Sequence, residues 1–210
     1  MAQLETNQKL RISSRSPCLF TLRIELLPNE IQPIIWRRLE VDGRISLCKL
    51  HHLIQAAFGW NDSHLHQFEI RGKTYAIPSE EDALYERVVE DERKAKLNRL
   101  VTEEDVLTYS YDLGDNWQHV ITVENIDYDL DHDPQGGAFI TDGARACPPE
   151  DVGGPDGYHH FLEVILTQPH SDEAKELLEW AGGPFDPHYF DKRSANAAIL
   201  RLLYNGWGGK

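Results

Sequence analysis

Apolar and polar residues repeat with two different periods in the first sixty positions of the chain. Residues 18–27 (CLFTLRIELL) alternate with a period of two, which is typical of a half-buried strand, and a second apolar run covers 34–41. Residues that favour turns separate these runs, so together they predict a hairpin with a longer loop. Over 47–58 apolar residues recur every three or four positions, which predicts a helix capped by Ser46 and ended by Gly59.

Strand patterns return after this helix. Residues 65–77 predict two short strands around a turn-forming glycine. Residues 106–112 and 117–124 alternate strictly on either side of a turn at 113–116, so they predict a second hairpin.

The last third of the chain has helical spacing. Apolar residues over 158–166 and 195–203 each define one face of a helix, Ser171 is a good N-cap for another, and Asp186-Pro187 is typical of a helix start. The sequence therefore predicts an α+β fold. It consists of an antiparallel sheet with one packed helix, in a β-grasp-like order, and a helical C-terminal third.

Charge is spread unevenly along the 210 residues. The chain has 21 Lys and Arg against 35 Asp and Glu, a formal net charge of −14. Residues 79–105 contain ten acidic and five basic residues, and we predict a solvated, mobile insertion with a short helix there. The polar residues 1–16 are predicted to form a flexible leader, and residues 17–210 a single domain that carries the insertion.

The acidic balance and the cysteine content limit the partners and the compartment. Proteins that bind duplex DNA gain affinity when Lys and Arg release counterions, so a net charge of −14 disfavours specific duplex DNA as a partner. Three cysteines without a CxxC pair indicate reduced thiols, and no apolar run is long enough for a signal peptide or a membrane span. We therefore expect a cytoplasmic protein without a membrane partner.

A pair of histidines after the first helix is the first candidate for chemistry. If Leu65 begins a strand, His64 and His66 point to the same face and can bind one metal ion. The alternative is an ordinary helix-to-strand turn with two half-exposed histidines.

The tip of the second hairpin is another candidate. Asp112, Asp115 and His119 can converge there beside Trp117, and carboxylates next to an imidazole serve in general acid–base chemistry or ligate a cation. Because a hairpin turn also needs Asp and Gly for conformational reasons, both interpretations remain open.

A third candidate is a segment rich in proline and glycine. Cys147 is followed by two prolines, which fix φ, and Gly153 and Gly154 permit positive φ, so Glu150 and Asp151 are held at little entropic cost. This suits a binding or catalytic loop, or a connector whose acids lie near the N-terminus of the next helix.

These blocks together resemble the plasmid pRiA4b ORF-3-like family. The matching blocks are Ile35–Val41, Leu50–Trp60, His64–Phe68, Tyr111–Trp117 with His119, Cys147–Gly154 and Phe185–Pro187. The similarity spans about residues 17–204, and it departs from the family at Leu113, where Phe is usual. The resemblance implies an association with plasmids or mobile elements, and some members carry the label of a transposon resolvase. It implies no catalytic residues.

Two functions follow as expectations. The first is a binding or interaction module for an unknown protein or small ligand, whose surface is formed by loops 60–66, 112–119 and 147–157. The alternative is a metal-dependent hydrolase with a divalent metal and a His/Asp cluster. The metal ligands of that alternative are predicted to be His64, His66, Asp115 and His119. An accessory role in DNA recombination is a third hypothesis, which the acidic charge and the lack of a helix-turn-helix pattern disfavour.

Overall fold

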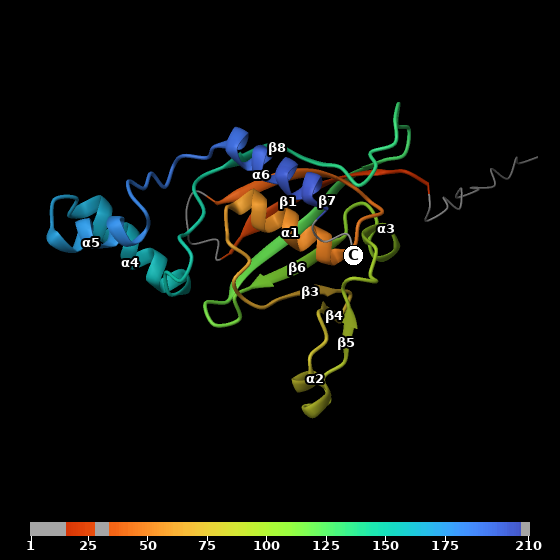
Figure 1. The fold of residues 1–210 in the computed structure, drawn as a ribbon, viewed down its shortest axis with the longest axis horizontal. Coiled ribbons are helices and arrows are strands. Elements are labelled where there is room, and N and C mark those ends of the chain that lie inside the picture. The colour runs from red at the N-terminus through yellow and green to blue at the C-terminus, as the bar shows by residue number, and fades with distance from the viewer. Residues whose placement is uncertain (1–15, 28–33, 207–210) are drawn as a thin grey trace, which may run out of the picture.

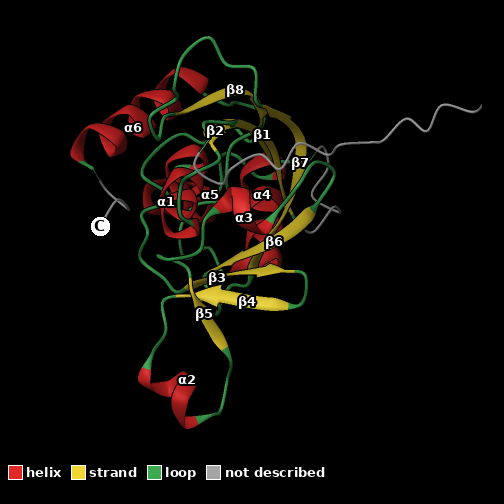
Figure 2. Ribbon diagram, turned by 90° about the vertical axis from the view of Figure 1, so that its right-hand side faces the viewer, coloured by secondary structure: helices red, strands yellow, loops and turns green. Residues whose placement is uncertain are grey.

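The fold is built on one eight-stranded sheet (Figure 1, Figure 2). The computed structural model describes residues 16–27 and 34–206, and the strand order across the sheet is β5-β4-β3-β6-β7-β1-β2-β8. The strands are β1 (Leu19–Leu26), β2 (Trp36–Asp42), β3 (His66–Ile70), β4 (Lys73–Ala76), β5 (Val89–Asp91), β6 (Val106–Tyr111), β7 (Trp117–Asp127) and β8 (Ala138–Ala144). The helices are α1 (Leu47–Phe58), α2 (Glu80–Leu84), α3 (Leu97–Leu100), α4 (Gly154–Thr167), α5 (Asp172–Trp180) and α6 (Lys192–Asn205).

The hairpins predicted from the alternating runs are confirmed. β1 pairs antiparallel with β2, β3 with β4, and β6 with β7. Along β1 every second side chain is buried, including Leu22, Ile24 and Leu26, so the period of two directs one face of the strand into the core. The structure thus has the predicted α+β class.

One strand makes the sheet mixed, so the prediction of an antiparallel sheet is wrong at its edge. β5 lies within the acidic stretch 79–105 and pairs in parallel with β4. The residues that follow it enter the core, where Glu92 and Leu97 are both 0% exposed. The stretch is therefore not solvated throughout. Only its first part, around α2, stands away from the sheet (Figure 2). A short edge strand is paired through its backbone, so its side chains need not carry an apolar pattern.

β8 lies at the opposite edge of the sheet, and its sequence also lacks the alternation of apolar and polar residues. It pairs antiparallel with β2, and Ile140 is its one fully buried residue. The Asn196 side chain of α6 bonds the backbone of Ile140 in both directions, accepting from its N–H at 2.8 Å and donating to its carbonyl at 3.0 Å. A strand with a single buried side chain shows no alternation, which is why it was not predicted.

Helices α1 and α6 lie side by side on the same side of the sheet (Figure 2). The predicted ends of α1 are confirmed: the Ser46 hydroxyl accepts from the Lys49 N–H, and Gly59 takes the left-handed conformation at φ 89°. His51 and Gln55 of α1 both bond the Tyr109 hydroxyl of β6, which ties the helix to the sheet. Since α6 also contacts β8, more than one helix covers the sheet.

Helices α4 and α5 pack on each other beyond the end of the sheet, near the turn between β6 and β7 (Figure 1). The prediction of a helix start at Asp186-Pro187 is wrong, because α6 begins at Lys192 and its N-cap is Asp191. The Pro187 carbonyl is held instead by the backbone N–H of Ala146 and by Arg145 Nε, which fixes this segment in a turn. Proline at a first helical position is also compatible with a turn, so the local signal was ambiguous.

The predicted leader lies almost wholly outside the described residues, which begin at residue 16. In the described part of the chain, no helix is both long and apolar enough to cross a membrane.

Candidate functional site

The loops that follow α1, β6 and β8 meet at one end of the sheet. The Trp60 indole Nε1 donates to the Pro148 carbonyl at 3.2 Å, and the Gly153 N–H donates to Asp115 Oδ2 at 3.1 Å. These contacts join segments that are far apart in the sequence, and they place the three predicted candidate regions against one another.

His64 stands where these loops converge. Its Nε2 atom lies 2.9 Å from Asp151 Oδ1, 3.7 Å from Asp112 Oδ2 and 3.8 Å from Glu150 Oε1. Nε2 is nevertheless a buried atom that makes no hydrogen bond within the described chain, so its approach to Asp151 is close in distance but poor in alignment. We call His64, Asp112, Glu150 and Asp151 the His64 cluster.

The backbone holds the carboxylates of the His64 cluster in place. Asp112 and Asp151 have positive φ values of 51° and 58°, a conformation that Asp tolerates better than most residues. Glu150 accepts from the Tyr111 hydroxyl and from the Asn61 N–H. Burial, and then the bond to Glu150, raise the pKa of Tyr111, so its hydroxyl stays a proton donor.

Two glycines shape the loop that carries Glu150 and Asp151. Gly153 is the N-cap of α4 at φ 91°, and Gly154 follows at φ 69°, so the expectation of positive φ at both positions is confirmed. A Cβ atom on Gly154 would lie only 2.7 Å from the Asp115 carbonyl oxygen. The loop can therefore approach the hairpin turn only with glycine at this position.

Gly154→Ala is expected to lower the free energy of unfolding by about 2–4 kcal/mol, because it adds a clash to a strained φ. Urea denaturation followed by tryptophan fluorescence measures this. Gly182→Ala is the matched control, since Gly182 also has a positive φ of 90° but has open space around it. If both variants lose the same stability, the contact with Asp115 contributes nothing.

The structure does not gather the four predicted metal ligands into one group. His66 Nε2 lies 3.0 Å from both carboxylate oxygens of the fully buried Glu92, and its ring stacks on that of His51 at 3.4 Å. Asp115 bonds the backbone of Gly153. Of the predicted set, His64 alone belongs to a group of metal-ligating side chains in the described residues.

Trp117 and His119 are core residues rather than surface contacts. They are 1% and 0% exposed, because both lie on the inner face of β7. The His119 ring packs edge-on against Phe58 and Trp60, and burial lowers its pKa to about 3. These two residues therefore lie in the core beneath the loops of the candidate site.

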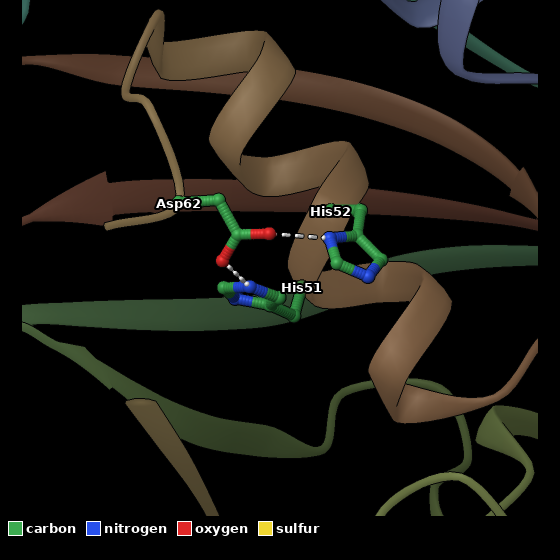
Figure 3. A group of neighbouring side chains, drawn as sticks. All are labelled: His51, His52 and Asp62. Atoms are coloured by element: carbon green, nitrogen blue, oxygen red, sulfur yellow. Dashed lines mark hydrogen bonds and ion pairs between the residues drawn. The ribbon is translucent and has the colours of Figure 1, made fainter. Parts of the chain in front are cut away.

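A second cluster escaped the sequence analysis: His51, His52 and Asp62 (Figure 3). The two histidines are consecutive on α1, and the Asp62 carboxylate lies between them, with Oδ1 2.6 Å from His51 Nε2 and Oδ2 2.9 Å from His52 Nδ1. A signal was present, because His51 falls on the apolar face of the predicted helix, and a buried histidine needs a partner.

A chain of hydrogen bonds links the side chains of Gln55, Tyr109, His51 and Asp62. The Asp62 N–H donates to Gln55 Oε1, so Gln55 Nε2 donates to the Tyr109 hydroxyl. That hydroxyl then donates to His51 Nδ1, which leaves His51 Nε2 to donate to Asp62. The second cluster is therefore satisfied without an ion, unlike the His64 cluster.

The two histidines of this cluster differ in charge. Burial lowers the pKa of His51 to about 4, despite its bond to Asp62. The bond to Asp62, and then the contact with Cys48, raise the pKa of His52 to about 9. Burial opposes ionisation of Asp62, but the two imidazole bonds outweigh it and hold the pKa of that carboxyl well below its usual range. At neutral pH, His51 is neutral and His52 is a cation that faces a carboxylate.

The family model of the plasmid pRiA4b ORF-3-like proteins matches residues 19–194. The chain belongs to this family. It is 35% identical over 191 residues to "Uncharacterized protein y4hQ" of Sinorhizobium fredii, which covers 90% of this chain and 93% of that protein. It is also similar to the crystal structure of the protein of unknown function MM3350 from Methanosarcina mazei Go1, with 33% identity and a TM-score of 0.73 over 85% of this chain and 97% of that one.

Two clefts flank the loop after α1 in this pRiA4b ORF-3-like protein. The first has a volume of about 480 Å³ and lies between Trp60, the segment from Cys147 to Asp151, Trp180 at the end of α5, and Phe185. The second, of about 300 Å³, lies between α1 and α6 and is lined by His52 and Asp62. Trp60 and Asn61 line both clefts, so this loop is the wall between them.

Proposed function

We propose that this pRiA4b ORF-3-like protein is a metal-dependent ligand-binding protein, with a divalent transition metal in the His64 cluster. The observation that carries the proposal is the His64 Nε2 atom, which is buried, lies within 3.8 Å of three carboxylate oxygens and makes no hydrogen bond to any of them. A single proton on Nε2 can serve one oxygen, whereas a metal ion can accept donors from all sides at once.

The distances from His64 Nε2 to the carboxylates are compatible with a shared ion. Donors about 2.1 Å from a common ion are about 3.0 Å apart in octahedral geometry and about 3.4 Å apart in tetrahedral geometry. The distances from His64 Nε2 to Asp151 and Asp112, 2.9 and 3.7 Å, fall around those values. One imidazole with several carboxylates suits Mn²⁺ or Zn²⁺ better than a soft metal such as Cu(I).

The ligand is proposed to enter the larger cleft. Asp151 and Glu150 form part of its wall, so an ion in the His64 cluster would stand at its rim. Trp60, Trp180 and Phe185 supply aromatic surface on the other sides. This combination fits a small molecule that has an anionic or oxygen-rich group for the metal and an apolar part for the aromatic rings.

Metal binding is tested by isothermal titration of untagged, chelator-treated protein with Mn²⁺ and with Zn²⁺. The wild-type chain is expected to bind one ion, and His64→Ala and Asp151→Asn are expected to weaken it at least about 100-fold, because each removes a ligand. His160→Ala is the matched control, since His160 pairs with Glu173 at 3.2 Å in an exposed position. Equal affinity in all four proteins, or no binding to the wild type, contradicts the proposal.

Hydrolysis of phosphoesters is a second candidate function. It is favoured by Glu150, which lies beside His64 and in the cleft wall, where a carboxylate can take a proton from water. Turnover of an aryl phosphodiester at saturating Mn²⁺ that is lost in Glu150→Gln supports hydrolysis. Binding without turnover leaves the ligand-binding function alone.

A further inference from the structure

Cys48 carries an arrangement that neither the metal proposal nor the family accounts for. It is the second residue of α1 and is half-buried. Its sulfur lies 3.9 Å from His52 Nε2, one helical turn along. The other nitrogen of that ring, Nδ1, lies 2.9 Å from Asp62 Oδ2. The imidazole of His52 thus contacts a thiol through one ring nitrogen and a carboxylate through the other.

This order of groups is the one that activates a sulfur nucleophile. The carboxylate holds the imidazole by Nδ1, so that Nε2 faces the sulfur and can exchange a proton with it. Asp62 is itself fixed, because it has a positive φ of 57°, its N–H donates to Gln55, and its second carboxylate oxygen is taken by His51. The His52 ring is therefore oriented before any reaction begins.

Positive groups lie near the Cys48 sulfur. His52 is a cation at neutral pH, and the N-terminus of a twelve-residue helix adds a positive partial charge at the second position. Arg93, which pairs with Asp91 at 2.8 Å, is a further cation in this region. The nearby acid Glu92 is engaged with His66.

The other two cysteines lie in surroundings that oppose ionisation of the thiol. Cys18 is 1% exposed, and burial raises its pKa. Burial also raises the pKa of the Cys147 thiol well above its usual range. A buried thiol that resists ionisation is a poor nucleophile, so Cys48 is set apart within this chain.

A metal between Cys48 and His52 is the competing explanation. Structural and catalytic zinc sites use at least three protein ligands. Within the residues that the structure describes, the groups of three metal-ligating side chains do not include Cys48. Asp62 lies on the Nδ1 side of the His52 ring, so Cys48 and His52 Nε2 are the two donors that could share an ion on the sulfur side, whereas all three groups together have the order of an activated thiol.

We propose that Cys48 is a reactive thiolate that exchanges with small disulfides and carries the resulting mixed disulfide. The Cys48 sulfur attacks one sulfur of the disulfide, so a new S–S bond to the protein forms as the old one breaks. The released thiolate takes the proton from His52 Nε2 and leaves as a thiol. The imidazole ends neutral, and no further oxidant is needed because the incoming disulfide is reduced.

The test is the rate at which the native, chelator-treated protein reacts with dithiodipyridine, a neutral aromatic disulfide whose released product absorbs light. A single fast thiol is expected, which mass spectrometry of the unreduced peptides assigns to Cys48 and which Cys48→Ser abolishes. His52→Gln is expected to slow the reaction roughly fivefold to tenfold at pH 6.5, because the thiolate fraction falls. Oxidised glutathione should modify the same residue more slowly.

Controls separate this chemistry from unfolding. His170→Gln removes an exposed histidine elsewhere in the chain and should leave the rate unchanged. If His52→Gln unfolds, as circular dichroism reports, the pH profile of the wild-type rate decides. An inflection below about 8.5, the usual pKa of a thiol, supports the proposal. An inflection at or above that value, a fast thiol other than Cys48, or a folded His52→Gln with the wild-type rate overturns it.

Discussion

Arg37→Met is expected to lower the free energy of unfolding by about 3–5 kcal/mol. Arg37 is 1% exposed and donates to four backbone carbonyl oxygens. These are Ala57 at 2.9 Å, Trp36 at 2.8 Å, Ala144 at 2.9 Å and Arg145 at 2.9 Å. Methionine fills a similar volume but donates nothing, so it removes a donor from each carbonyl.

Arg37→Met should also disturb the candidate site. The Ala57 carbonyl belongs to the end of α1, just before the loop with Trp60, and the Arg145 carbonyl precedes the segment with Glu150 and Asp151. One guanidinium therefore positions two walls of the larger cleft. Arg37→Lys should restore little of the stability, because an ammonium group cannot reproduce the planar fork.

Urea denaturation measures this effect, and the neighbouring arginine supplies the control. Arg38 is partly exposed and pairs with Glu124 at 2.6 Å, so Arg38→Met should change the free energy of unfolding by no more than about 1 kcal/mol. A loss of under 1 kcal/mol in Arg37→Met would show that the buried guanidinium contributes no net stability.

Mild acid should destabilise the protein strongly through two buried histidines. Burial lowers the pKa of His51 to about 4 and that of His119 to about 3, whereas histidine in an unfolded chain titrates near 6.5. Between pH 6.5 and 4 the unfolded chain therefore binds protons that the folded protein excludes. The free energy of unfolding should fall by roughly 1.4 kcal/mol per pH unit for each histidine.

The free energy of unfolding should also fall at alkaline pH, for the opposite reason. His52 has a raised pKa of about 9, so its contribution is complete below pH 6.5 and is lost as pH rises toward 9. Stability should thus be greatest near pH 6.5. Between pH 6.5 and 4.5 the two buried histidines together should remove roughly 5 kcal/mol, which is comparable to the whole stability of many domains.

Denaturation curves at pH 6.5, 5.5 and 4.5 test the acid effect, and His119→Leu assigns it. That variant loses a bond to the Tyr109 carbonyl and should be less stable at every pH. The informative quantity is the slope with pH, which should be about half that of the wild type. An unchanged slope would mean that His119 titrates normally in the folded protein.

Local pattern predicted most of the central sheet and its helix, because those elements have one buried face each. The hairpins of β1 with β2 and of β6 with β7, and the caps of α1, follow from residue types close together in the sequence. β5 and β8 were missed for a common reason. Edge strands are paired through backbone hydrogen bonds and bury few side chains, so they leave little period-two signal.

The candidate site was predictable as a set of loops but not as a set of contacts. Pro and Gly marked the segment around Glu150 and Asp151 as rigid, and the structure confirms the positive φ of Gly153 and Gly154. The sequence paired His64 with His66, whereas the structure separates them. His64 precedes β3 and faces the loops, while His66 lies within β3 and turns toward Glu92. An i, i+2 relation holds only while both residues belong to one strand.

What the sequence determined by itself is therefore much of the local conformation: where the strands and helices with one buried face lie, where α1 is capped, and which loop is stiff. It also identified the family. The tertiary structure decided which distant polar groups meet, because packing of the sheet brings His64 to Asp151. The turn after α1 returns Asp62 to His52, which already faces Cys48 within the helix. Hydrophobic periodicity depends on residues close together in the sequence. The partner of a buried charge is the group that the folded chain places within about 3 Å of it.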